Sequence, residues 1–179
     1  MSSVSPIQHT SLWSAGLVAL VLGGCLLIGC LEPLVAVAVI AASALPFGRA
    51  LLLTAAVWLA GQAIGFGLHD YPRDAQTISW GVGLGVAALV STTAAVAPLH
   101  AFRGEPMWLR AGAAFVTAFV SNQVVILGVE QIITGACMVR PGVISLVGAV
   151  NATWLVGLLA LDAGLRRAVP SLPAFGRPA

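Results

Sequence analysis

Residues 78–99 read ISWGVGLGVAALVSTTAAVAPL, a run of 22 residues without a charged side chain. At about 1.5 Å of rise per residue, a helix of this length covers the ~30 Å of hydrocarbon in a bilayer. Inside hydrocarbon the backbone must satisfy its own hydrogen bonds, and a helix does so within one segment. This stretch therefore predicts an all-α integral membrane protein.

The composition of the whole chain agrees with this stretch. Of its 179 residues, 59% are hydrophobic and only 8% are charged, and the mean hydropathy is +1.02. A soluble domain carries about 25% charged residues, because water must solvate its surface. We therefore expect most of the surface to face lipid, and a single domain, because no polar stretch is long enough to fold separately.

Six apolar stretches predict a six-helix transmembrane bundle with a short second helix. They cover residues 12–31, 34–45, 50–68, 78–99, 108–133 and 143–165. A tail precedes them at 1–11, and a flexible tail follows at 166–179. The second stretch is too short to span comfortably, so it is either a short helix shielded by its neighbours or a re-entrant one.

The arginines predict the orientation, since the chain contains no lysine. With six spans and both termini on one side, that side is the richer in arginine and belongs to the cytoplasm. Arg73 and Arg140 lie on the other side. A composition rich in alanine, glycine and arginine points to a bacterial inner (plasma) membrane. If residues 34–45 re-enter, five spans remain and the N-terminus lies outside.

Several function classes are disfavoured. The eight arginines are scattered and give a net charge of only +2, so no basic stripe exists for nucleic acid. The three cysteines fit neither a zinc nor a redox spacing. No hydrolase, metalloprotease or phosphate-loop motif is present. We therefore predict no enzyme, cofactor or metal, although His69, Asp70, Asp74 and Glu130 form a weak mixed-ligand alternative.

Polar side chains within apolar spans are the best pointers to a site, because an unsatisfied polar group in hydrocarbon is costly. Counting residues along the predicted spans places four amides in one layer of the outer half of the membrane, with Trp154 nearby: Gln62, Asn122, Gln123 and Asn151. Such a layer would suit an uncharged or zwitterionic ligand. It would equally suit interhelical hydrogen bonds of about 0.6 kcal/mol each.

A charged rim is expected above this layer. Gln62 and His69 are seven residues apart, as are Gln123 and Glu130, so each pair shares one helix face. With Asp70, these residues predict a solvated, polar entrance above the amide layer. The alternative is an ordinary solvated loop region. The predicted ligand-binding set is Gln62, His69, Asp70, Asn122, Gln123, Glu130, Asn151 and Trp154.

Small residues on the first stretch predict a contact with another helix. Ala15 and Ala19 are four residues apart, a spacing that lets two helices approach closely. The contact is either with the rest of the bundle or with another protein.

A six-helix chain of this length, with this alanine spacing on its first helix, resembles the substrate-binding S-component of energy-coupling factor (ECF) transporters. The resemblance implies a vitamin- or metal-binding subunit whose pocket faces outward. It also implies that Ala15 and Ala19 contact the transmembrane coupling subunit of an ATP-driven module. The leading hypothesis is therefore a small-molecule binding and transport subunit. The alternative is a non-catalytic accessory or assembly subunit of a larger membrane complex.

Overall fold

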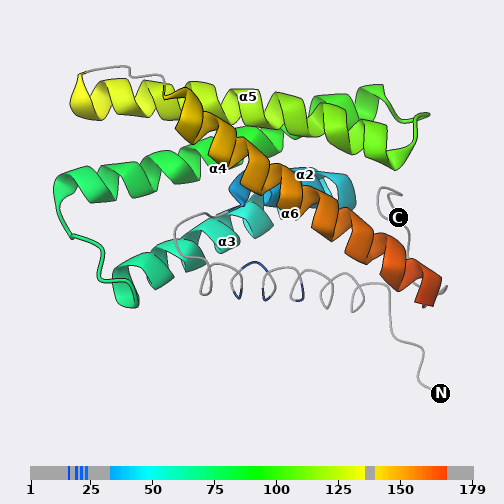
Figure 1. The fold of residues 1–179 in the computed structure, drawn as a ribbon, viewed down its shortest axis with the longest axis horizontal. Coiled ribbons are helices and arrows are strands. Elements are labelled where there is room, and N and C mark those ends of the chain that lie inside the picture. Colours follow the sequence, from blue (N-terminus) through cyan, green and yellow to red (C-terminus); the bar gives the residue numbers. More distant parts are fainter. Residues whose placement is uncertain are drawn as a thin grey trace.

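The computed structural model describes residues 33–135 and 140–168, together with four residues of the first apolar stretch: Gly16, Ala19, Val21 and Gly23. Residues 33–135 and 140–168 form five helices and no strand. The helices, labelled as in Figure 1, are α2 (Leu34–Ala44), α3 (Phe47–Gly67), α4 (Ala75–Ala101), α5 (Met107–Thr134) and α6 (Pro141–Ala168).

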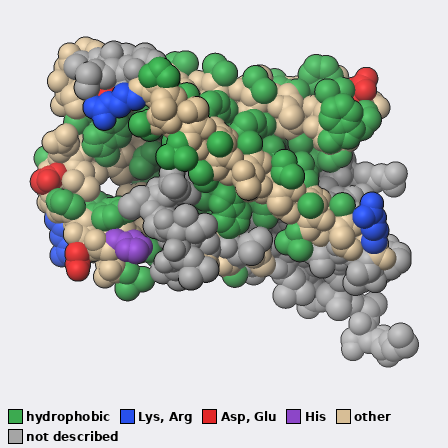
Figure 2. All heavy atoms as spheres, in the orientation of Figure 1, with side chains coloured by type: hydrophobic (Ala, Val, Ile, Leu, Met, Phe, Trp, Pro, Cys, Tyr) green, Lys and Arg blue, Asp and Glu red, His purple; other side chains and the backbone are tan. Residues whose placement is uncertain are grey.

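Four of these helices are long and apolar enough to cross a bilayer. They are α3, α4, α5 and the portion of α6 from Pro141 to Leu161. Figure 2 shows charged side chains gathered at the two ends of the elongated molecule, with apolar side chains over the middle. This distribution fits a hydrocarbon layer between two polar surfaces. The protein is therefore membrane-embedded and helical.

The predicted six-span bundle is wrong for the part of the chain that the structure describes. α2 has 11 residues, which at about 1.5 Å per residue cover roughly half of the hydrocarbon thickness. It therefore cannot count as a span. The predicted first span, 12–31, lies outside the described residues except for the four residues named above.

The short α2 lies at the centre of the fold and packs against α3, α4, α5 and α6. Every residue from Leu34 to Ala41 is buried. A helix that is apolar on all sides lies either in a protein core or in lipid, and here the neighbouring helices cover it. Of the two alternatives for residues 34–45, the structure therefore has the short helix shielded by its neighbours.

The longest interface joins α4 and α5, which run antiparallel side by side (Figure 1). Thr117 on α5 donates to the carbonyl of Ala94 on α4 at 3.4 Å, and Asn122 donates to Ser91 at 3.3 Å. Alanines line the contact, and Ala114 and Ala118 are fully buried. Small side chains let the two backbones approach closely, which is how helices associate where no hydrophobic effect drives them together.

α3 packs against α4 through two glycines and a pair of threonines. A Cβ added at Gly85 would lie 2.5 Å from the Trp58 ring, and one added at Gly81 would overlap the Gln62 carbonyl oxygen. Further along, Thr92 donates a buried hydrogen bond to Thr54 at 3.0 Å. Residues that come later in α3 contact residues that come earlier in α4, so the two helices are antiparallel. The start of α3 therefore lies at the same end of the bundle as the end of α4.

The helix bundle therefore has two ends, and each is named by the loop that it holds. The 68–74 end holds the connection from α3 to α4, and the 102–106 end holds the connection from α4 to α5. α2 precedes the start of α3 directly, so it occupies the half of the bundle next to the 102–106 end.

Asp74 begins α4 with a hydrogen-bonded cap. Its carboxylate accepts a 2.7 Å hydrogen bond from the backbone N–H of Thr77. The hydrogen bonds from the backbone and side chain of Thr77 lower the pKa of the Asp74 carboxyl below its ordinary value. An N-cap carboxylate supplies an acceptor to an otherwise unpaired N–H and faces the positive end of the helix dipole.

We expect Asp74→Ala to lower the melting temperature slightly at pH 7, because the cap is lost. A lowered carboxyl pKa contributes stability above the ordinary value of about 3.9, and that stability disappears as pH falls through the lowered pKa. The difference between the two proteins should therefore shrink in acid. Asp74→Asn is the control, since it keeps the acceptor and loses the titration. A difference that is constant from pH 7 to pH 3 would contradict this account.

Candidate functional site

The N-terminus of α2 is held by the side chain of Asn151 on α6. The Asn151 carbonyl oxygen accepts hydrogen bonds from the backbone N–H groups of Val35 at 3.0 Å and Ala36 at 3.1 Å. Its amide nitrogen donates to the carbonyl of Val147 at 3.0 Å. Asn151 is only 2% exposed. A helix start leaves backbone N–H groups unpaired, and α2 has no cap from its own N-cap residue, Pro33.

This cap lies at the middle of the membrane span. Asn151 is the central residue of the apolar stretch Pro141–Leu161, about 15 Å from either end of it. α2 therefore starts near mid-depth and runs toward the 102–106 end.

Asn122 and Gln123 form a short polar chain with Ser91. The buried Asn122 donates to the Ser91 hydroxyl at 3.3 Å, and the Gln123 side-chain amide donates to the side-chain oxygen (Oδ1) of Asn122 at 3.5 Å. The half-buried Gln123 accepts no hydrogen bond on its own carbonyl oxygen within the described residues. Asn122 therefore joins α4 to α5, and Gln123 keeps one unused acceptor.

Gln62 and Trp154 have hydrogen-bonding groups without partners among the described residues. Both side chains are half-buried within apolar spans. In residues 33–135 and 140–168, the Gln62 amide makes no hydrogen bond, and neither does the Trp154 indole N–H. Trp154 packs against the buried core, while the Gln62 oxygen lies against Gly81. Together with Gln123, these groups offer neutral donors and acceptors inside the spans.

The amides lie at two depths and not in the single layer that residue counting predicts. Gln62 lies opposite Gly81 of α4, whereas Asn122 lies opposite Ser91. Ten residues of helix separate these two α4 positions, which is about 15 Å. Gln62 therefore lies toward the 68–74 end, while Asn122, Gln123 and Asn151 lie deeper. The difference arises because α3 and α5 are offset along α4, whereas counting residues from the loops assumes that the helices begin at the same depth.

The predicted rim residues lie at the 68–74 end. His69 and Asp70 are exposed, and the His69 ring stacks on Tyr71 with centroids 6.2 Å apart. Asp70 adopts a φ of 49°, a left-handed conformation that Asp tolerates better than most residues. Glu130 is half-buried near the contact of Val129 with Gly83. Among the described residues, no three His, Cys, Asp or Glu side chains gather closely enough for a metal ion.

Of the predicted partner-binding pair, Ala19 is helical and exposed, while Ala15 lies outside the described residues. Val21, two positions further, is fully buried in the core. The predicted contact with a coupling subunit stays a prediction.

Residue counting overlooked several polar contacts between the helices that hold the site residues. Trp58 donates to the carbonyl of Gly81 at 2.9 Å, and Ser91 accepts from Asn122. Thr54 and Thr92 bond to each other. The available signal was the presence of small hydroxyl residues within uncharged spans, where they commonly face a neighbouring helix.

No family model, curated protein or solved structure matches this chain.

Proposed function

We propose that this protein is a small-molecule binding and transport subunit. The observation that carries the proposal is the half-length α2, which starts at mid-depth with its N–H groups bound to Asn151. Discontinuous helices that begin inside the membrane commonly form substrate sites in transporters, because their ends bring backbone polar groups to the midplane. Here the first N–H groups of α2 are bonded to Asn151, so the polar groups left for a ligand are side chains.

Three polar side chains within the spans have groups that remain available to a ligand. Gln62, Gln123 and Trp154 lie on three different helices, α3, α5 and α6: Gln62 toward the 68–74 end, Gln123 near mid-depth, and Trp154 about one turn beyond Asn151 toward the 102–106 end. Each offers a donor or acceptor that forms no hydrogen bond among the described residues. An amide without a partner in hydrocarbon costs a few kcal/mol. A ligand with its own polar groups would remove that cost.

The absence of charged residues in the inner parts of the spans indicates the class of ligand. The inner parts of the four spans, residues 50–67, 75–99, 111–129 and 141–161, contain no Asp, Glu, Lys or Arg. An ion buried there would lack a counter-charge and would pay a large desolvation cost. The substrate is therefore uncharged or zwitterionic, with apolar surface and a few hydrogen-bonding groups, as in most small-molecule sites.

The predicted location and partner belong to this proposal. Arg49, Arg103 and Arg110 lie at the 102–106 end with Arg167, whereas Arg73 and Arg140 lie at the opposite end. By the positive-inside rule, the 102–106 end faces the cytoplasm of a bacterium and the binding region faces outward. An ATP-driven coupling module remains the proposed partner, as in the ECF transporters whose S-component the chain resembles.

The test is native mass spectrometry on the protein extracted gently from its own membrane. We expect a small molecule at unit stoichiometry, lost in Gln62→Leu. Because the Gln62 amide makes no hydrogen bond with the described residues, this change should leave the melting temperature equal or higher. Gln76→Leu, a change of the same type at an exposed position on the first turn of α4, is the control.

A molecule that is retained equally by Gln62→Leu would contradict the proposed site. A chain that carries no small molecule but retains other membrane subunits would favour the second candidate, a non-catalytic accessory or assembly subunit. One observation supports that candidate. Asn151, Asn122 and Trp58 all use their side chains for bonds within the fold, as purely structural polar residues do.

A further inference from the structure

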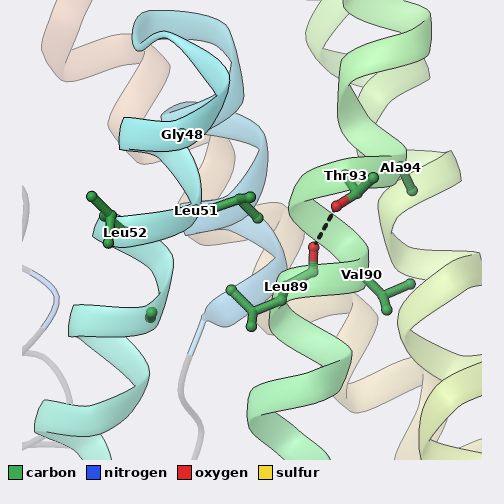
Figure 3. Close-up of a pocket in the computed structure, with 8 residues that line it drawn as sticks. Gly48, Leu51, Leu52, Leu89, Val90, Thr93 and Ala94 are labelled. Carbon is green, nitrogen blue, oxygen red and sulfur yellow. Dashed lines mark hydrogen bonds between the residues drawn. The ribbon is translucent and has the colours of Figure 1, made fainter.

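An apolar groove runs between α3 and α4 on the outside of the bundle. Its lining includes Gly48, Leu52 and Ala55 of α3 and Val90, Thr93 and Ala94 of α4, around a volume of about 740 Å³ (Figure 3). The Thr93 hydroxyl donates to the carbonyl of Leu89 at 3.0 Å, so it does not make the groove polar. Leu52 is 71% exposed and Val90 37% exposed, so the groove opens outward.

The groove belongs to one leaflet. Its α3 lining from Gly48 to Ala55 covers about 10 Å of helix, starting at the first turn of α3. One leaflet contributes about 15 Å of hydrocarbon. The groove therefore runs from the membrane surface at the 102–106 end toward mid-depth, which is the path of a lipid acyl chain.

An exposed arginine lies at the depth of the groove's surface end, next in the chain to a lining residue. Arg49 directly follows the groove residue Gly48, is exposed, and makes no ion pair or hydrogen bond within the described residues. At the same end, Arg103 bonds to His100 at 3.1 Å and Arg110 bonds to the carbonyl of Leu99 at 3.2 Å. The acidic residue of the 102–106 loop is the exposed Glu105, which pairs with none of these arginines.

The local backbone adds to this positive potential. The first turn of α3 contains no acidic residue, and its N-cap, Pro46, provides no side-chain acceptor. A guanidinium therefore coincides with the positive end of a helix dipole, which is unfavourable unless an anion is present. An apolar groove that ends at such a point matches an anionic amphiphile.

We propose that the α3–α4 groove binds an anionic phospholipid, with one acyl chain along the groove and the phosphate at Arg49. The site lies at the opposite end of the bundle from the proposed ligand region, and it does not depend on the transport proposal. Phosphate contacts with arginine are strong because both partners are charged.

The test is native mass spectrometry of the purified full chain in detergent with phosphatidylglycerol or phosphatidylcholine of identical acyl chains. We expect phosphatidylglycerol to be retained about tenfold more strongly, and Arg49→Gln to remove that preference, since a hydrogen bond to a charged group contributes about a factor of ten or more. Arg140→Gln, an exposed arginine beside the start of α6, should keep the preference.

A second pair of variants tests the groove without touching charge. Ala55→Phe fills the groove and should reduce retention of phosphatidylglycerol, whereas Ala56→Phe, on the exposed neighbouring position, should not. Equal retention of the two lipids, or an Arg49→Gln variant with unchanged preference, would overturn the proposal. It would also be overturned if a protein subunit co-purified with the chain and was lost in Ala55→Phe while lipid retention was unchanged.

Discussion

Replacing Asn151 with leucine is expected to lower the free energy of unfolding by roughly 3–5 kcal/mol, because two buried N–H groups lose their acceptor. These are the N–H groups of Val35 and Ala36, which begin α2 at mid-depth. Chemical denaturation in mixed micelles would measure the difference.

Two controls separate the cap from a general effect of a buried polar residue. Asn151→Asp keeps an oxygen for the N–H groups, and in its protonated form it can still donate to the carbonyl of Val147, so it should recover part of the loss. Asn122→Leu removes a long bond to Ser91 and should cost only about 1 kcal/mol. If Asn151→Leu unfolds no more easily than Asn122→Leu, then α2 does not need this cap.

Replacing Gly85 with leucine is expected to cost about 3 kcal/mol, because the side chain would overlap the Trp58 ring. A Cβ alone would lie 2.5 to 2.9 Å from three ring atoms of Trp58. The indole is also fixed by its hydrogen bond to the carbonyl of Gly81. Either Trp58 moves and loses this bond, or α3 moves away from α4.

The matched control is Gly128→Leu on α5. Nothing lies within 4 Å of a Cβ at Gly128 and the position is exposed, so the same substitution should change stability by less than about 0.5 kcal/mol. The two variants should be compared by the same mixed-micelle denaturation. Similar values for both would mean that the glycine contact between α3 and α4 contributes little to the fold.

The segments that form helices were largely predictable from the sequence. Residues 78–99 lie inside α4, and residues 108–133 lie inside α5. Several helices start earlier than the apolar runs, as α3 does at Phe47 and α4 at Ala75. The reason is that Pro46 and Asp74 begin these helices, and polarity alone does not mark a cap.

The candidate site was only partly predictable. Polar residues within uncharged spans, such as Asn151 and Gln62, were identified correctly as unusual, but not the partners that they bond or lack. Asn151 lies 116 residues from Val35, and no local pattern connects them. Gln62 and Asn122 were assigned one depth, although they lie opposite α4 residues ten positions apart.

The sequence by itself determined that this chain is helical and lies in a membrane, because hydrocarbon admits long uncharged segments only when each one satisfies its backbone internally. The tertiary structure alone decided that α2 is a buried half-helix capped by Asn151 and that an apolar groove lies between α3 and α4. These features depend on which helices pack against each other and on which faces they choose for that contact. In a membrane that choice is made by close packing and a few hydrogen bonds between distant residues, and not by hydropathy.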